Sequence, residues 1–539
     1  MNKSRSFRPP CLLFTVCCML FSVLSAQSWQ SRYNGPGNDE DLGYGVVADP
    51  SGNAYVTGAS WGLSTSYDAA TVKYGPAGES LWAVRYDGAT HGPDEARGIA
   101  ISGNTVAITG ATSDANLFTD VLTAAYDRSG ALLWSATYNG PSGGNDMGFA
   151  SAVDNSGNVY VTGFAHDDST SWDVVTIKYN SAGVRQWASS YRTDYEDFGS
   201  HITLDDAGNV YVVGSSGNPY LLTWDFVTIK YNSGGVEQWA ERYNGPAGED
   251  DEPHGIAVDN SGNVFVCGGS LDSTSGLDYV TIKYNAAGET AWVRRYNGPA
   301  NSSDEANALG LDDAGNVYVT GYSQGQGTDV DYATVKYDPA GNQLWAMRYD
   351  GPASGFDEAR AIAVDGGGFA TVTGSSAGTG TSADYATVRY RPDGTEESAQ
   401  RYNGPGNDFD EANAIVLDPT GGVIVTGSSF GSGTGNDYAT LRYAAVGIEE
   451  GSRPAADGSR PATVVRNVLI LQSAFCNLTS EISLLDASGR CVLTRPLGHL
   501  AAGPLSLDVS TVPPGLYFIA GRSAVSGERS ALLKLIIAK

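Results

Sequence analysis

Eight aspartates recur along the chain at nearly equal intervals, and the residue three places after each one differs from copy to copy. The aspartates are Asp41, Asp94, Asp146, Asp197, Asp251, Asp304, Asp357 and Asp410. The variable residues are Tyr44, Arg97, Phe149, Ser200, His254, Asn307, Arg360 and Asn413. A residue found in every copy is expected to be structural, because a single ligand does not need eightfold symmetry. The variable positions are therefore the first candidates for binding or catalysis.

The recurring aspartates allow two interpretations. Those followed by a glutamate (Glu95, Glu252, Glu305, Glu358 and Glu411) could belong to a ring of carboxylates that gathers cations such as Ca²⁺. Alternatively, each Asp accepts hydrogen bonds from backbone N–H groups in a turn. We favour the second, because the acids lack the closely spaced oxygen ligands of a calcium loop. We predict no metal site and no cofactor, with Ca²⁺ as the alternative.

Signals for an enzyme are few. The chain has 5 His, and it contains no His-Glu-x-x-His or Gly-x-Ser-x-Gly motif. The residues available to a polysaccharide hydrolase or lyase are Arg97, His201, His254 and Arg360. Without a base and nucleophile at a defined spacing, they do not identify an active site. We assign no catalytic residue, and an enzyme of this kind stays the alternative to a binding protein.

A repeat of 52 or 53 residues must position these side chains. The phrase Asp-Tyr-Ala-Thr-Val-Lys-Tyr and its near copies begin at Asp68, Asp120, Asp173, Asp225, Asp278, Asp331, Asp384 and Asp437. Each copy contains four segments with strand-like composition, separated by Gly-containing turns, and none shows a sustained helical period. Four strands per unit in a repeated array predict a β-propeller blade. The prediction is an all-β, eight-bladed propeller over residues 27–445.

The two ends of the array predict a closed ring. The fourth strand of most units carries Trp four residues before Tyr, as in Trp292 and Tyr296. The last unit stops after its third strand at Tyr443, and the missing pattern occurs at residues 29–33. We predict that this N-terminal strand completes the last blade, which hides a sheet edge. Ser398 takes the place of Trp in the unit before it.

If the first strand of each unit is the innermost, the variable residues surround one mouth of the channel. The next position is Gly or Ala in every copy except His201. The connections between second and third strands lie on the same face, and they include Trp172 and Trp224. An asymmetric, aromatic and partly basic face is typical of a binding surface, although loops also vary where nothing constrains them. The predicted ligand-binding residues are Tyr44, Arg97, Phe149, Trp172, His201, Trp224, His254 and Arg360.

The repeat resembles a known family. Gly-Ile-Ala-Val-Asp-Asn-Ser-Gly-Asn-Val-Phe-Val-Cys-Gly at residues 255–268, followed by Thr-Ile-Lys-Tyr-Asn-Ala-Ala-Gly and Trp292, is similar to the bacterial SBBP β-propeller repeat. The resemblance covers residues 29–443. The family name implies seven blades, whereas the count here is eight. The family has no general catalytic motif, so the resemblance implies a scaffold rather than an activity.

The first residues have the layout of a secretory signal peptide. A basic segment is followed by an apolar core and by Ala26 at a plausible cleavage site. We expect residues 1–26 to be removed, and the rest has no other apolar run long enough to span a membrane. The formal net charge is −28. Such acidity argues against a nucleic-acid partner.

A second domain is expected after a Pro- and Gly-rich linker at residues 446–462. Residues 463–539 are predicted to form a small Ig-like β-sandwich. Asp486-Ala-Ser-Gly-Arg490, Pro514-Gly-Leu-Tyr517 and the terminal Lys539 resemble the type A C-terminal sorting domain of type IX secretion. The resemblance implies that the secretion machinery is a partner and that the protein is secreted or held at the cell surface. Cys476 and Cys491 could pair, but connectivity does not follow from sequence.

Overall fold

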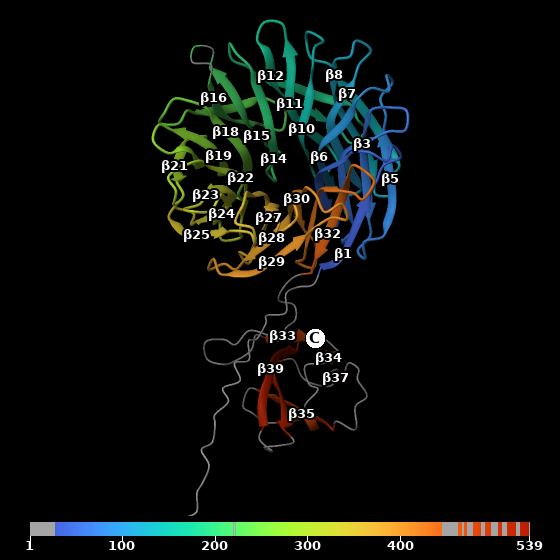
Figure 1. The fold of residues 1–539 in the computed structure, drawn as a ribbon, viewed down its shortest axis with the longest axis vertical. Coiled ribbons are helices and arrows are strands. Elements are labelled where there is room, and N and C mark those ends of the chain that lie inside the picture. The colour runs from blue at the N-terminus through green and yellow to red at the C-terminus, as the bar shows by residue number, and fades with distance from the viewer. Residues whose placement is uncertain are drawn as a thin grey trace, which may run out of the picture. The chain divides into compact units, whose positions relative to one another are not determined.

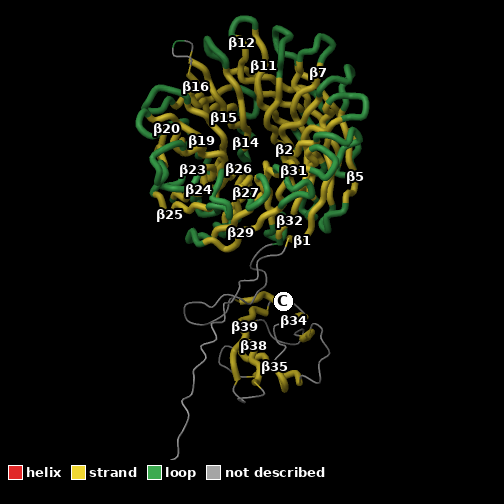
Figure 2. Tube along the Cα trace, viewed as in Figure 1, coloured by secondary structure: helices red, strands yellow, loops and turns green. Residues whose placement is uncertain are grey.

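The computed structural model describes residues 27–218, 220 and 223–444, together with seven strands between residues 462 and 537. The expected signal peptide and residues 446–461 of the expected linker lie outside the described residues. In the described part, every regular element is a strand (Figure 2). It contains no helix long and apolar enough to cross a membrane. The predicted all-β class is confirmed.

Residues 27–444 form eight four-stranded antiparallel sheets arranged around a central axis (Figure 1). This confirms the prediction of an eight-bladed propeller. Blades one to four are β2 (Asp41–Ala48), β3 (Ala54–Trp61), β4 (Tyr67–Tyr74) and β5 (Ser80–Tyr86); β6 (Asp94–Ser102), β7 (Thr105–Ser113), β8 (Thr119–Asp127) and β9 (Leu132–Tyr138); β10 (Met147–Val153), β11 (Val159–Asp167), β12 (Ser171–Tyr179) and β13 (Arg185–Tyr191); and β14 (Asp197–Leu204), β15 (Val210–Asn218), β16 (Thr223–Tyr231) and β17 (Glu237–Tyr243).

Blades five to eight are β18 (Asp251–Val258), β19 (Val264–Asp272), β20 (Gly276–Tyr284) and β21 (Thr290–Tyr296); β22 (Asp304–Leu311), β23 (Val317–Gln324), β24 (Val330–Tyr337) and β25 (Gln343–Tyr349); β26 (Asp357–Val364), β27 (Ala370–Ala377), β28 (Ala383–Tyr390) and β29 (Glu396–Tyr402); and β30 (Asp410–Leu417), β31 (Val423–Phe430), β32 (Asn436–Tyr443) and β1 (Gln27–Tyr33). The first strand of each blade contacts the first strands of both neighbouring blades. These strands therefore line the central channel.

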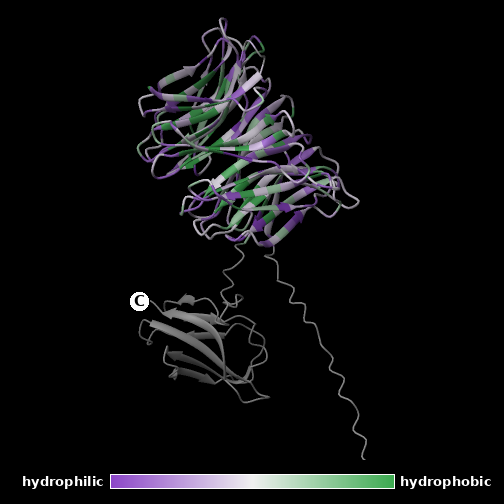
Figure 3. Ribbon diagram, turned by 90° about the vertical axis from the view of Figure 1, so that its left-hand side faces the viewer, coloured by the Kyte–Doolittle hydropathy of each residue, from purple (hydrophilic) through white to green (hydrophobic). Residues whose placement is uncertain are grey.

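The strand sequences explain the packing between blades. The second and third strands are almost wholly buried, because small and branched residues on both of their faces pack against neighbouring blades. Between blades eight and one, for example, Val56, Val72, Tyr74, Ile424 and Tyr438 share one core cluster. Figure 3 shows hydrophobic residues along the strands and hydrophilic residues in many of the turns. The core is thus divided into layers between successive blades.

A tryptophan on the fourth strand joins each of seven blades to the next. Trp345 donates its indole N–H to the carbonyl of Pro392, at 3.1 Å, in the turn between the third and fourth strands of the next blade. A Cβ on Gly394 would lie 2.9 Å from the Trp345 ring, and this glycine has a φ of 87°. Both the space and the backbone angle therefore require Gly. The other six donors are Trp29, Trp82, Trp134, Trp187, Trp239 and Trp292.

The N-terminal strand β1 is the fourth strand of blade eight, and it pairs antiparallel with β32. Trp29 lies opposite Arg442, and Tyr33 lies opposite Tyr438. The register extends across both strands, as the sequence pattern predicted. Because β1 comes from the other end of the chain, no hairpin turn joins β32 to its outer neighbour. This explains Ser398 on the fourth strand of blade seven. A tryptophan at that position would pack on a turn between the third and fourth strands of blade eight, and no such turn follows β32.

Residues 445–539 form a separate unit. One sheet has the order β33 (Ala462–Val465), β39 (Arg529–Ile537), β38 (Gly515–Ser523), β35 (Leu478–Asp486) and β36 (Cys491–Pro496). A second sheet pairs β34 (Val468–Leu471) with β37 (Leu505–Asp508). The strand positions agree with the predicted ones, except that the first predicted segment is divided into β33 and β34. Any Cys476–Cys491 pairing lies outside the described side chains.

Candidate functional site at the channel mouth

The eight variable residues share one backbone feature. Counted from the recurring Asp, each first strand has a register shift between the third and fifth residues, so the fourth residue has no partner on the second strand. The unpaired residues are Tyr44, Arg97, Phe149, Ser200, His254, Asn307, Arg360 and Asn413. A β-bulge bends the strand and re-aims a side chain. The fold therefore presents one variable side chain from every blade at the same depth of the channel.

The recurring aspartates are structural, as favoured from the sequence. Asp251 is buried and accepts a hydrogen bond of 2.6 Å from the backbone N–H of Gly245 in the preceding connection. The same bond recurs from Gly35 to Asp41 and from Gly404 to Asp410. Burial raises the pKa of all eight carboxyls, and it raises the pKa of Asp197 and Asp251 to about 6.

The glutamates that follow these aspartates have a different role. On one side of the mouth, each bulged residue contacts the glutamate of the next blade. His254 Nε2 lies 2.7 Å from Glu305 Oε1, and Asn307 Nδ2 donates to Glu358 Oε1 at 3.1 Å. Arg360 continues the series with an ion pair to Glu411 and a second one to Glu358 at 3.0 Å. We call Glu252, Glu305, Glu358 and Glu411 the acidic arc.

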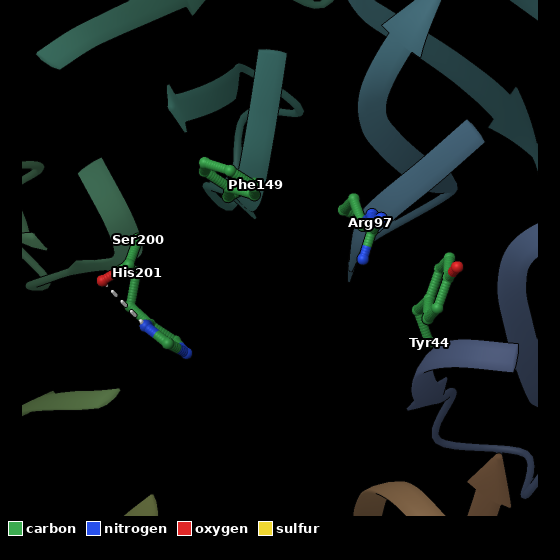
Figure 4. Close-up of a pocket in the computed structure, with 5 residues that line it drawn as sticks. All are labelled: Tyr44, Arg97, Phe149, Ser200 and His201. Atoms are coloured by element: carbon green, nitrogen blue, oxygen red, sulfur yellow. Dashed lines mark hydrogen bonds between the residues drawn. The ribbon is translucent and has the colours of Figure 1, made fainter. Parts of the chain in front are cut away.

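The opposite side of the mouth is aromatic and hollowed. A cavity of about 330 Å³ is lined by Tyr44, Arg97, Phe149, Ser200 and His201, which point toward an open centre in Figure 4. The Arg97 guanidinium lies over the Tyr44 ring at 4.4 Å and contacts Glu95 at 3.1 Å. The first strands of blades one to four thus bring five side chains from four successive repeats into one site.

His201 is the histidine that replaces Gly or Ala in the repeat. Its ring is exposed to the channel, with Nδ1 3.2 Å from the Ser200 hydroxyl. Desolvation lowers the pKa of His201, and repulsion from His254 adds to this effect. The imidazole is therefore neutral near pH 7, so one ring nitrogen donates a hydrogen bond and the other accepts one.

The sequence suggested that Trp172 and Trp224 lie in loops, and this is wrong. They lie near the starts of β12 and β16, because these strands are longer than predicted, and both side chains are half-buried. Trp172 packs against Phe164 and Phe198, and Phe198 packs against Trp224 at 5.3 Å between ring centroids. Phe164 in turn contacts Phe149 at the cavity. The two tryptophans support the cavity wall through this cluster.

The mouth as a whole is not basic. Arg97 and Arg360 are both ion-paired, and the glutamates outnumber them. Of the eight predicted residues, Tyr44, Arg97, Phe149 and His201 line the cavity; His254 and Arg360 contact the acidic arc. Sequence reasoning missed Phe164, Phe198 and Tyr322. Phe164 and Phe198 stand where most other blades have a smaller or acidic residue, and comparison of the repeats at those positions would have found them.

A comparison with protein families matches the SBBP β-propeller repeat to residues 186–220, 238–271 and 291–327. Each match runs from the fourth strand of one blade through the first two strands of the next. An uncharacterized WD repeat-containing protein of Acanthamoeba polyphaga mimivirus is 23% identical over 373 residues, which cover 61% of this chain and 24% of that protein. The chain thus spans about a quarter of that relative.

Among solved structures, the WD40 domain of SCAP from fission yeast has a TM-score of 0.44 and 8% identity, over 75% of this chain and 96% of that one. The periplasmic gluconolactonase of Pseudomonas aeruginosa has a TM-score of 0.41 and 13% identity, over 64% and 94%. An ulvan lyase of family PL25 has a TM-score of 0.38 and 12% identity, over 78% and 95%. A β-propeller fold by itself assigns no activity. Residues 27–444 thus form an eight-bladed β-propeller, and three segments of it match the SBBP β-propeller repeat.

Proposed function

We propose that this chain is an exported, non-enzymatic propeller that binds a glycan at the aromatic side of its channel mouth. The observation that carries the proposal is the cavity, in which Tyr44 and Phe149 meet the neutral His201 and the Ser200 hydroxyl. Aromatic faces pack against sugar rings at low cost in ordering, and neutral hydrogen-bonding groups suit sugar hydroxyls. The acidic arc disfavours a strongly anionic polymer.

Export is the second part of the proposal. It is supported by the signal-peptide pattern at residues 1–26 and by the resemblance of residues 463–539 to the type A sorting domain. The second domain, an Ig-like β-sandwich in this proposal, contacts the type IX secretion machinery. The mature protein is then secreted or held on the outer face of the outer membrane. Truncation after Ala444 tests this step, because the shortened chain should fold but stay in the periplasm.

A glycan array with the intact protein tests the binding proposal. The variant Tyr44→Ala/Phe149→Ala/His201→Gly removes the cavity side chains, and Gly is the residue that blades one, two and five have at the position of His201. Wild type should bind a subset of neutral glycans, and the variant should lose them while it still folds and unfolds cooperatively. A protein or matrix ligand captured in place of a glycan, and lost in the same variant, would assign the site to that class.

A specific contact favours one alternative function, a polysaccharide hydrolase or lyase. His254 is held by Glu305, whose second oxygen accepts a hydrogen bond of 2.6 Å from the Tyr322 hydroxyl. A base oriented by a carboxylate is the arrangement that proton abstraction requires. Release of reducing ends or unsaturated sugars from a bound polysaccharide, abolished in His254→Asn, would support this alternative over the binding protein.

A further inference from the structure

Three potential metal ligands meet where blades five and six adjoin at the channel mouth. One oxygen of Glu252, the His254 imidazole and one oxygen of Glu305 lie within 4.8 Å of one another. His254 Nε2 is 2.7 Å from Glu305 and 3.9 Å from Glu252. The Glu252 side chain is 56% exposed, so it is free to turn toward the other two. Glu305 is mostly buried and fixed.

The repeat provides an internal control for this cluster. The corresponding trio in any blade consists of the residue after the recurring Asp, the bulged residue, and the residue after the Asp of the next blade. At the next junction the trio is Glu305, Asn307 and Glu358, and at the one after it an arginine occupies the middle place. An arginine side chain has no lone pair to offer a metal ion. In blades one to four, each trio contains an apolar residue or lacks an imidazole. The combination of two carboxylates and a histidine occurs at this junction alone.

A second position departs from the repeat at the same place. The residue paired with Glu305 across the strands is Tyr322, whose hydroxyl donates to Glu305 Oε2 at 2.6 Å. The equivalent residues of the other blades are Ala59, Ala111, Phe164, Ser215, Gly269, Ser375 and Ser428. None of these has a phenol. Tyr322 holds one oxygen of Glu305 and leaves the other directed at His254, as an outer partner of a metal ligand does.

The electrostatics of the cluster suit a cation. The carboxylates of Glu252 and Glu305 both face the His254 imidazole, with one oxygen of each within 4.8 Å of the other ligand atoms. A divalent ion that replaces the proton between His254 and Glu305 would be attracted by both acids.

We propose that Glu252, His254 and Glu305 form a binding site for a divalent first-row transition metal ion, with Zn²⁺ as the probe. Imidazole nitrogen and carboxylate oxygen are ligands that zinc accepts at about 2.0–2.2 Å. Three protein ligands leave a coordination position open toward the channel, where water or a sugar hydroxyl can enter. The site is independent of the aromatic cavity, so it stands whether or not a glycan binds there.

Calorimetric titration of the untagged full-length protein with Zn²⁺ tests the proposal. The main variant is His254→Asn, because blades six and eight have Asn at this position. In blade six, Asn307 donates a hydrogen bond to Glu358, the glutamate of the next blade. Glu252→Gln changes an exposed side chain and keeps its shape. Tyr322→Phe removes only the outer hydroxyl. The matched control is Glu95→Gln, the equivalent of Glu252 in blade two, because no histidine lies in that trio.

We expect one zinc ion per wild-type chain, with an affinity reduced at least about tenfold in His254→Asn and Glu252→Gln. Tyr322→Phe should weaken binding by about tenfold, because outer partners orient the ligand. Glu95→Gln should bind as wild type does. If wild type binds no zinc, or if His254→Asn and Glu252→Gln bind it with unchanged affinity while their melting temperatures are normal, the contact between His254 and Glu305 serves only to join two blades.

Discussion

Arg32 of the first strand donates to Asp437 of the last blade at 2.8 Å, although 405 residues separate them. The same guanidinium donates to the carbonyl of Ser429 at 2.7 Å and to the Tyr402 hydroxyl at 3.0 Å. Five other blades contain the same Arg–Asp pair between neighbouring strands, as in Arg85 and Asp68. Blade eight thus uses the ordinary contact of the repeat to close the ring.

Loss of this contact should destabilise the ring. Arg32→Ala leaves the nearly buried Asp437 carboxylate without its partner, which costs about 3–5 kcal/mol in the free energy of unfolding. Denaturant unfolding measures the change. Arg192→Ala is the control, because its side chain is exposed and lies 3.9 Å from Asp167. Deletion of residues 27–33 should lower the melting temperature further. Unchanged unfolding of both variants would contradict closure by β1.

The tryptophan contacts between blades give a second prediction. Trp345→Ser should lower the free energy of unfolding by about 3 kcal/mol, because it removes a buried indole and its hydrogen bond to the next blade. The reverse change, Ser398→Trp, should give no gain, because blade eight has no hairpin turn after β32. A stabilised Ser398→Trp protein, measured by chemical denaturation, would contradict this explanation of Ser398.

The aromatic cluster behind the cavity gives a third prediction. Trp224→Ala should reduce stability by about 2 kcal/mol, since the half-buried indole packs on Phe198 and Tyr195. His201→Gly should leave stability nearly unchanged, because it introduces a residue that three other blades have there, at an exposed position. Thermal unfolding compares the two. Equal effects would mean that the cluster does not support the wall.

Buried aspartates should make the propeller more stable in mild acid. Asp197 and Asp251 have folded-state pKa values of about 6, above the ordinary value of 3.8. The native state therefore binds more protons between about pH 4 and 6, and stability rises as pH falls from 7 to 5. We expect a gain of about 1–3 kcal/mol in the free energy of unfolding. The double variant Asp197→Asn/Asp251→Asn should lack most of this slope, whereas an unaltered slope would assign it elsewhere.

The fold could be predicted from the sequence because the same pattern of strands and turns occurs in every copy of the repeat. Because no Trp-x-x-x-Tyr pattern follows Tyr443, the sequence also predicted that the N-terminal strand pairs with the strand that ends at Tyr443. The site was harder to predict, because its geometry depends on bulges that have no marker residue: Tyr44 and His254 share a position but no chemistry. The contact of His254 with Glu305 depends on how two neighbouring blades pack, and the contact of Tyr322 with Glu305 depends on register across two strands of one blade. The ion pairs of Arg97 and Arg360 with glutamates, which offset the partly basic character expected of this face, depend on side-chain placement rather than on chain order.

The most direct test of the binding site is a binding measurement on the intact protein before and after the cavity is emptied. Once a glycan is found by array, its affinity is measured for wild type, Tyr44→Ala/Phe149→Ala/His201→Gly and the exposed control Arg192→Ala. The site described here predicts at least about a tenfold loss of affinity, roughly 1.4 kcal/mol, in the triple variant alone, measured at a temperature where that variant is fully folded. Equal affinity in all three proteins would contradict a ligand site at this mouth.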